Sequence, residues 1–266
     1  MLFVSDIHFG ANRDEDVASF VSDALNPDIN PDRLVIIVGD ITQNATKDEF
    51  KAAETFILQL LDGGMKLVFT PGNHDFGNWM AEYLKVNNKA RAWCRNLLSP
   101  IFKQDEVVAV NDYDAIFKFQ ENIFVTLRST HRGELEKLGL LGNNRISKKQ
   151  ISWAASVLSD LDAKGCKLHL VTHRSIWRES GDMHHGMGKR GRLEKMLLKP
   201  FRFHSFIHGH NHRFVYSQTS TPRMAMPIIR LAVPTLSMRN KNWQPGYVSW
   251  EKNCNVPPKL ISRNHI

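Results

Sequence analysis

The chain of 266 residues contains only three cysteines, no long apolar run and no segment rich in glycine, proline or serine. Three widely separated cysteines argue against a disulfide framework and against a zinc site built from thiolates, and they favour a reducing compartment. No apolar run approaches the roughly 18 to 20 residues of a membrane-spanning helix. The opening MLFVSDIHFG lacks the basic and apolar regions of a signal peptide. We therefore expect a cytoplasmic protein, and without a linker we expect a single domain over residues 1–266.

Acidic and basic residues are unevenly distributed along the chain. Residues 1–133 carry 13 Lys and Arg against 19 Asp and Glu, whereas residues 134–266 carry 22 against 8. The basic second half either attracts an anionic partner through its long-range field or forms a solvated basic surface. The charge pattern alone does not decide between these two interpretations.

Short apolar runs alternate with helical patterns in the first part of the chain. The runs at 2–5, 34–39 and 66–70 are typical of buried strands, and the apolar spacing at 14–25 and 46–64 predicts helices between them. This β-α-β-α-β order indicates a mostly parallel sheet. Further along, the patterns predict helices at 78–98, 147–165 and 192–199, and strands at 107–110, 115–119, 123–127, 167–172 and 204–207. Three apolar runs after residue 213 suggest further strands, so we expect two packed mixed sheets with helices outside.

Five of the predicted strands are followed directly by Asp, Asn or His. These residues are Asp6 and His8, Asp40, Asn73 with His74 and Asp75, His173, and finally His208, His210 and His212. Ligands of open α/β sheets bind beyond the carboxyl ends of the strands, so these residues should converge. Each alone has an ordinary explanation as a turn residue, a helix cap or a core histidine. Because all five strands are followed by such residues at the same end, a shared site explains them better than five separate structural roles.

The chemistry of this set favours metal binding. Carboxylate and imidazole ligands without thiolate suit Mn²⁺, Fe, Zn²⁺ or Co²⁺ rather than Ca²⁺ or Mg²⁺ alone. Seven candidate ligands exceed the need of one tetrahedral metal, whereas two metals sharing a carboxylate would use them. Paired metals roughly 3.5–4 Å apart activate a water and clamp a phosphate during in-line displacement. A histidine that holds no metal can protonate the leaving oxygen.

These blocks resemble the calcineurin-like metallophosphoesterase superfamily. Its pattern of DxH, GD, GNH[DE], a lone His and GHxH is present in order, ending at Gly209-His210-Asn211-His212. The resemblance implies a four-layer α/β/β/α sandwich with two divalent metal ions, of which Mn²⁺ is expected to support activity best. It implies one metal on Asp6, His8 and His212, a second on Asn73, His173 and His210, and Asp40 as the bridge. It also implies His74 as the general acid, oriented by Asp75.

Details of the blocks limit the substrate. The sequences GDITQNA and GNHD differ from the GDxxDRG and GNHE motifs of the superfamily's protein phosphatases, which argues against protein phosphatase activity. The blocks resemble most the small bacterial-type phosphodiesterases, including the class III cyclic-nucleotide enzymes, although Arg174-Ser175 follows His173 where those often have His-Pro or Pro. We therefore expect hydrolysis of a small phosphodiester, such as a cyclic nucleotide or another nucleotide-type ester.

Three alternatives stay open at this point. A nuclease would use the basic second half on DNA or RNA, because phosphate contacts dominate nucleic-acid binding. A phosphomonoesterase would use the same metals. A catalytically inactive metal-bearing scaffold for a protein partner is disfavoured by the intact His74. The basic loop 179–192 and His131 are candidates for the substrate pocket, and His208 lies outside the pattern.

Overall fold

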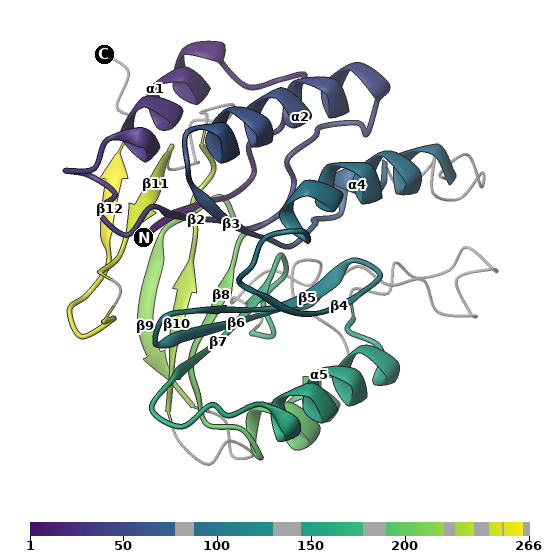
Figure 1. Cartoon of the computed structure of the whole chain (residues 1–266), viewed down its shortest axis with the longest axis vertical. Helices are drawn as coiled ribbons and strands as arrows, with labels where there is room; N and C mark the ends of the chain where they lie inside the picture. Colours follow the sequence, from purple (N-terminus) through teal and green to yellow (C-terminus); the bar gives the residue numbers. More distant parts are fainter. Residues whose placement is uncertain are drawn as a thin grey trace.

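The protein is described from a computed structural model, which covers residues 1–77, 88–129, 145–177, 190–220, 227–236, 245–251 and 253–262. Two β-sheets pack together with helices on their outer faces (Figure 1). The first sheet has the order β12-β11-β1-β2-β3. Its strands are β1 (Leu2–Val4), β2 (Leu34–Ile37), β3 (Lys66–Phe69), β11 (Gly246–Ser249) and β12 (Lys259–Ser262). β1, β2 and β3 run parallel, whereas β11 and β12 are antiparallel to their neighbours.

The second sheet has the order β4-β5-β6-β7-β8-β10-β9. Its strands are β4 (Val107–Asn111), β5 (Asp114–Phe119), β6 (Asn122–Thr126), β7 (Lys167–Thr172), β8 (Phe203–His208), β9 (Val215–Thr219) and β10 (Ile228–Ala232). The central strands β6, β7, β8 and β10 are parallel, and the outer strands are antiparallel to their neighbours. Both sheets are therefore mixed, as predicted.

Helices form the two outer layers. α1 (Asp14–Leu25), α2 (Lys47–Asp62) and α4 (Asn88–Ile101) lie on one side of the paired sheets, and α5 (Lys148–Asp160) lies on the opposite side (Figure 1). Thr46 and Ser147 begin α2 and α5 with capping boxes, in which each side chain accepts from the third helical residue. The four-layer α/β/β/α order predicted from the sequence is confirmed. Among the described residues, no helix has both the length and the apolar character needed to span a bilayer.

Alternation along the central strands divides the core in two. Phe124 of β6 packs in the cluster shared with the first sheet, whereas its neighbours Ile123 and Val125 pack against the α5 side. Successive side chains of a strand point to opposite faces, so the second sheet is apolar on both faces. Because both faces are buried, the central strands have continuous apolar runs in the sequence and no alternation of apolar and polar residues.

The last described residues complete both sheets. β9 and β10 extend the second sheet beside β8, and β11 and β12 extend the first sheet beside β1. This connection supports treating residues 1–266 as one domain, which stays a prediction. The helix predicted at residues 192–199 is irregular, because a short helix α6 (Arg190–Leu193) continues as the π-helical turn η3 (Glu194–Leu198).

Candidate metal centre

The carboxyl ends of strands from both sheets meet at one place. β1, β2 and β3 of the first sheet end before Asp6, Asp40 and Asn73, and β7 and β8 of the second sheet end before His173 and the segment with His210 and His212. Within each sheet, backbone hydrogen bonds join neighbouring ends: the Asp6 N–H donates to the Gly39 carbonyl at 2.9 Å, and the Gly209 N–H donates to the His173 carbonyl at 3.0 Å. Between the sheets, the His210 N–H donates to Asp6 Oδ2 at 3.0 Å. The expected convergence therefore occurs, across the junction of the two sheets.

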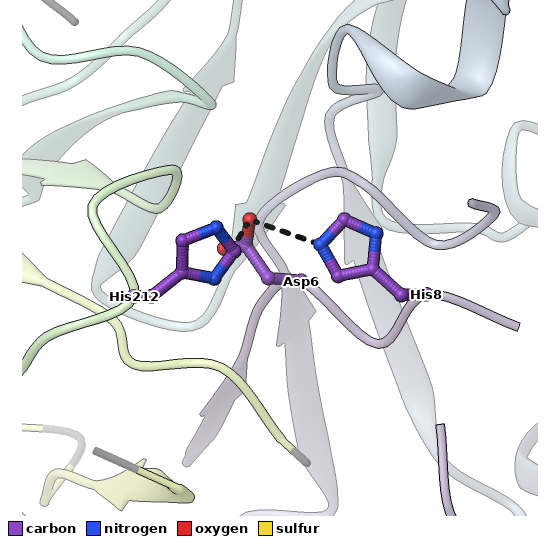
Figure 2. Close-up of side chains that lie close together, drawn as sticks. All are labelled: Asp6, His8 and His212. Atoms are coloured by element: carbon purple, nitrogen blue, oxygen red, sulfur yellow. Dashed lines mark ion pairs between the residues drawn. The ribbon is translucent and has the colours of Figure 1, made fainter. Parts of the chain in front are cut away.

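The first group of candidate ligands contains Asp6, His8 and His212. One ligand atom from each lies within 4.8 Å of the other two. Figure 2 shows the two imidazoles on either side of the Asp6 carboxylate, whose Oδ1 lies 3.8 Å from His8 Nε2 and 3.7 Å from His212 Nδ1. These three ligand atoms are close enough together to hold one cation.

The second group contains Asp40, His173 and His210, again with ligand atoms within 4.8 Å of one another. His173 Nε2 lies 2.9 Å from Asp40 Oδ2, and its Nδ1 lies 2.8 Å from the Val38 carbonyl oxygen. The carbonyl fixes the ring so that Nε2 faces the carboxylate, which is the usual way a ligand histidine is oriented.

The ligand backbone has an uncommon conformation. φ is 52° at Asp6, 55° at His8, 51° at Asp40, 69° at His210 and 53° at His212. Residues other than glycine seldom adopt this left-handed conformation, and they concentrate at functional sites when they do. Sharp left-handed turns directly after the strands bring these side chains back over the sheet ends.

Two glycines of the sequence blocks permit close approach at this site. A Cβ on Gly72 would overlap the Asp40 carboxylate. A Cβ on Gly209 would overlap the Ser5 hydroxyl and would lie 2.9 Å from Asp6 Oδ2. Both positions therefore need glycine because no other residue leaves room for a buried carboxylate beside the backbone.

The donor set fits divalent metal ions. Asp6 Oδ1 and both ring nitrogens of His8 are buried and make no hydrogen bond with any described residue. Burial lowers the pKa of His8 to about 4, although the nearby carboxylates of Asp40 and Asp6 act to raise it. His8 is therefore neutral and its lone pair is available, as a metal ligand requires.

Asp40 and His173 form a charged pair in the absence of metal. Burial opposes both charges, but the pairing prevails, since it raises the pKa of His173 to about 9 and holds the pKa of Asp40 well below its usual range. A protonated His173 then supplies the positive charge that this carboxylate requires. Asp40 also acts on the pKa of His8, so its charge reaches both groups of ligands.

His74 lies beside both groups. Its backbone N–H donates to Asp40 Oδ1 at 2.7 Å, and its ring stands edge-on to the His8 ring at 4.9 Å between centroids. We expected Asp75 to orient this imidazole, but the Gln43 carbonyl oxygen lies 2.7 Å from His74 Nδ1 instead. A backbone carbonyl has no side-chain signature, so no sequence pattern indicates this contact.

Asp75 is buried and connects two loops. Its carboxylate accepts hydrogen bonds from the Thr42 N–H at 2.9 Å, the Thr42 hydroxyl at 3.1 Å and the Gly72 N–H at 2.8 Å. Burial, together with the Asp40 charge, raises its pKa to about 6. Asp75 thus joins the loop after β2 to the loop after β3, and its partner Thr42 is next in sequence to Gln43, whose carbonyl contacts His74.

Asn73 is half-buried and flanked by two residues that contact Asp40. Its Oδ1 accepts a hydrogen bond at 3.1 Å from Nη2 of Arg174, a contact that the sequence did not predict.

His208 belongs to neither group: its Nε2 accepts a hydrogen bond from Arg230 Nε at 3.0 Å inside the sheet. The candidates His131 and 179–189 lie outside the described residues.

The family model for calcineurin-like phosphoesterases matches residues 1–214, and the chain belongs to this family. It is therefore a hydrolase of phosphate esters with ligands for metal. No curated protein matches the sequence.

Solved structures share the fold at low identity. A dimetal phosphatase from Danio rerio is 13% identical, with a TM-score of 0.57 over 93% of this chain and 90% of that one. Purple acid phosphatase PPD1 from yellow lupin is 14% identical, with a TM-score of 0.58 over 93% of this chain and 48% of that one. The protein TT1561 of Thermus thermophilus is 13% identical, with a TM-score of 0.55 over 98% of this chain and 97% of that one. At these identities the likeness concerns the fold.

Proposed function

We propose that the protein hydrolyses small phosphate esters with two divalent metal ions, of which Mn²⁺ is expected to support activity best. Asp6, His8 and His212 would hold one metal, and His173, His210 and Asn73 the other. Asp40 would join them, since its charge acts on a histidine of each group. The observation that carries this proposal is the presence of two three-ligand groups at the sheet junction, in which every ligand except His212 is buried. The two groups are adjacent, since the His210 N–H donates to Asp6 Oδ2 at 3.0 Å. When bound, the metals would lower the pKa of a shared water and neutralise charge on the phosphate.

His74 is the proposed proton donor to the leaving oxygen. The Gln43 carbonyl oxygen accepts a hydrogen bond from His74 Nδ1–H, so Nε2 would carry the proton that is transferred. Asp75 is a positioning residue in this scheme. It accepts hydrogen bonds from Thr42, the neighbour of Gln43 in the sequence, and from Gly72, two residues before His74. Loss of Asp75 would let both loops move and would misdirect the imidazole.

The kind of ester is a separate question. The sequence favoured a phosphodiester of nucleotide type, with a monoester or a nucleic acid as alternatives. The assembled ligands and the proton donor support an enzyme over an inactive scaffold.

A cytoplasmic location also stays a prediction.

A panel of esters tests this function. Purified protein is stripped with a chelator, reloaded with Mn²⁺ and assayed on bis(p-nitrophenyl) phosphate, p-nitrophenyl phosphate, a set of cyclic nucleotides and single-stranded DNA. We expect turnover of at least one small ester and two metals per chain by elemental analysis. His8→Gln should lose metal, whereas the matched His204→Gln, outside both groups, should keep it. Two bound metals without turnover of any ester would favour the scaffold instead.

A further inference from the structure

The two oxygens of the Asp6 carboxylate have different surroundings. Oδ2 accepts hydrogen bonds from the Ser5 hydroxyl and, at 3.0 Å, from the His210 N–H. Oδ1 is buried and makes no hydrogen bond with any described residue. It is also the oxygen that lies 3.8 Å from His8 Nε2 and 3.7 Å from His212 Nδ1 (Figure 2). A cation held by these two imidazoles would therefore meet Oδ1 of Asp6.

The Ser5 hydroxyl has one hydrogen and two acceptors within reach. Besides Asp6 Oδ2, its Oγ lies 2.9 Å from the Val38 carbonyl oxygen. That carbonyl already accepts a hydrogen bond at 2.8 Å from His173 Nδ1. A charged carboxylate is also the stronger acceptor. The hydroxyl hydrogen therefore points to Asp6, so that two donors occupy the lone pairs of Oδ2 and leave Oδ1 for a cation.

The backbone around Ser5 is fixed by a segment from the other end of the chain. Ser5 is fully buried, pairs with Thr235 in an isolated bridge, and its carbonyl accepts from the Leu236 N–H at 3.2 Å. The Thr235 hydroxyl donates to the Asp6 carbonyl at 2.9 Å. Gly209 leaves the space that the Ser5 hydroxyl fills, since a Cβ there would overlap it. The hydroxyl is thus held in place before any cation binds.

We propose that Ser5 is a positioning residue that holds Asp6 as a one-oxygen ligand, through Oδ1, of the metal shared with His8 and His212. This inference rests on the pair of metals in the proposed function. Hydrogen bonds to a ligating carboxylate fix its orientation, and their loss typically lowers metal affinity by about 10- to 100-fold. Because Asp6 belongs to only one of the two ligand groups, removal of the Ser5 hydroxyl should weaken one metal and largely spare the other.

The test compares Ser5→Ala with the wild type and with the matched variant Ser205→Ala. Ser205 is also fully buried, and its Oγ lies 2.7 Å from Nδ1 of His169, which belongs to neither ligand group. Each protein is stripped with a chelator and titrated with Mn²⁺ by calorimetry. We expect two sites in the wild type, with one of them weakened about 10- to 100-fold in Ser5→Ala. Ser205→Ala should keep both affinities, and urea unfolding in chelator checks that both variants are folded.

Electron paramagnetic resonance gives a second measurement that needs no turnover. At a Mn²⁺ concentration that fills both sites of the wild type, the two ions should show magnetic coupling, whereas Ser5→Ala should show isolated Mn²⁺. Unchanged affinity at both sites of Ser5→Ala, or an equal loss at both, would overturn the role of Ser5. A wild type that binds fewer than two Mn²⁺ per chain would instead refute the paired metals of the proposed function, and this inference with them.

Discussion

Asp114 carries a prediction about stability that can be worked out from its surroundings. This carboxylate is buried at the start of β5, and its Oδ1 accepts from the Arg128 N–H at 2.7 Å and from Gln150 Nε2 at 3.1 Å. Burial raises its pKa from 3.8 to about 7, against the lowering effect of these hydrogen bonds. Between about pH 4 and pH 7 the folded protein therefore binds more protons than the unfolded chain. The contribution of Asp114 to the free energy of unfolding accordingly falls as the pH rises through this range.

The magnitude follows from the shift. One pKa unit corresponds to about 1.4 kcal/mol, so the raised pKa of Asp114 lowers the free energy of unfolding by about 4 kcal/mol at pH 8, where the folded carboxyl group is ionised. At pH 5 the folded carboxyl group is still protonated, and the free energy of unfolding is lowered by only about 1.5 kcal/mol. Asp114→Asn removes the charge, and its amide oxygen can still accept both hydrogen bonds. The variant should therefore be more stable than the wild type, with an advantage about 3 kcal/mol larger at pH 8 than at pH 5.

Urea unfolding of both proteins at the two pH values measures this difference. A chelator is present throughout, so that metal binding does not vary with pH. The difference between variant and wild type isolates Asp114 from the other groups that titrate over the same range. The same advantage at both pH values, or a less stable variant at pH 8, would refute the reasoning.

Three further predictions concern the metal centre. His74→Ala should keep both metals but lower kcat by about 10²- to 10⁴-fold, the contribution of a positioned proton donor; kinetics with elemental analysis checks this, and unchanged kcat would exclude the role. Asp40→Asn should lower the metal content because the shared charge is lost, whereas Asp114→Asn, an equally buried change away from the site, should keep two metals. Chelation should lower the melting temperature of the wild type by circular dichroism, since bound metal stabilises only the folded state, and equal shifts in Asp40→Asn would show that metal binds elsewhere.

The sequence predicted the strands well where burial on both faces determines their composition. β2 and β7 stand where apolar runs ended in Asp40 and His173, and both groups of ligands assemble as their positions after the strands indicated. The short edge strand β12 was not predicted, because Lys259–Ser262 is half exposed and has no continuous apolar run. The end of the helix predicted to reach residue 165 was also wrong: α5 stops at Asp160, since Leu161 is already extended.

The contacts around the site were harder to predict for a different reason. The Gln43 carbonyl at His74 is a backbone group, and any residue type at position 43 would provide it. The bond from Arg174 to Asn73 joins residues 101 positions apart, and nothing in the local spacing relates them. Sequence patterns therefore identify which side chains belong to the centre, whereas their orientation depends on loops from both sheets that meet only in the fold.

The left-handed backbone conformation of the ligand residues shows how the fold orients these side chains. A non-glycine residue in such a conformation is destabilised by about 1 kcal/mol or more, and it persists only where the surrounding structure enforces it. At Asp6 and His8 the enforcing contacts are backbone hydrogen bonds to the neighbouring strand end, from the Asp6 N–H to Gly39 and from the His8 N–H to Asp40. These bonds involve no ligand atom, so the turns form without a metal. The sheet ends thus prearrange the ligands, and removal of one ligand side chain should weaken metal binding while leaving the fold around it unchanged.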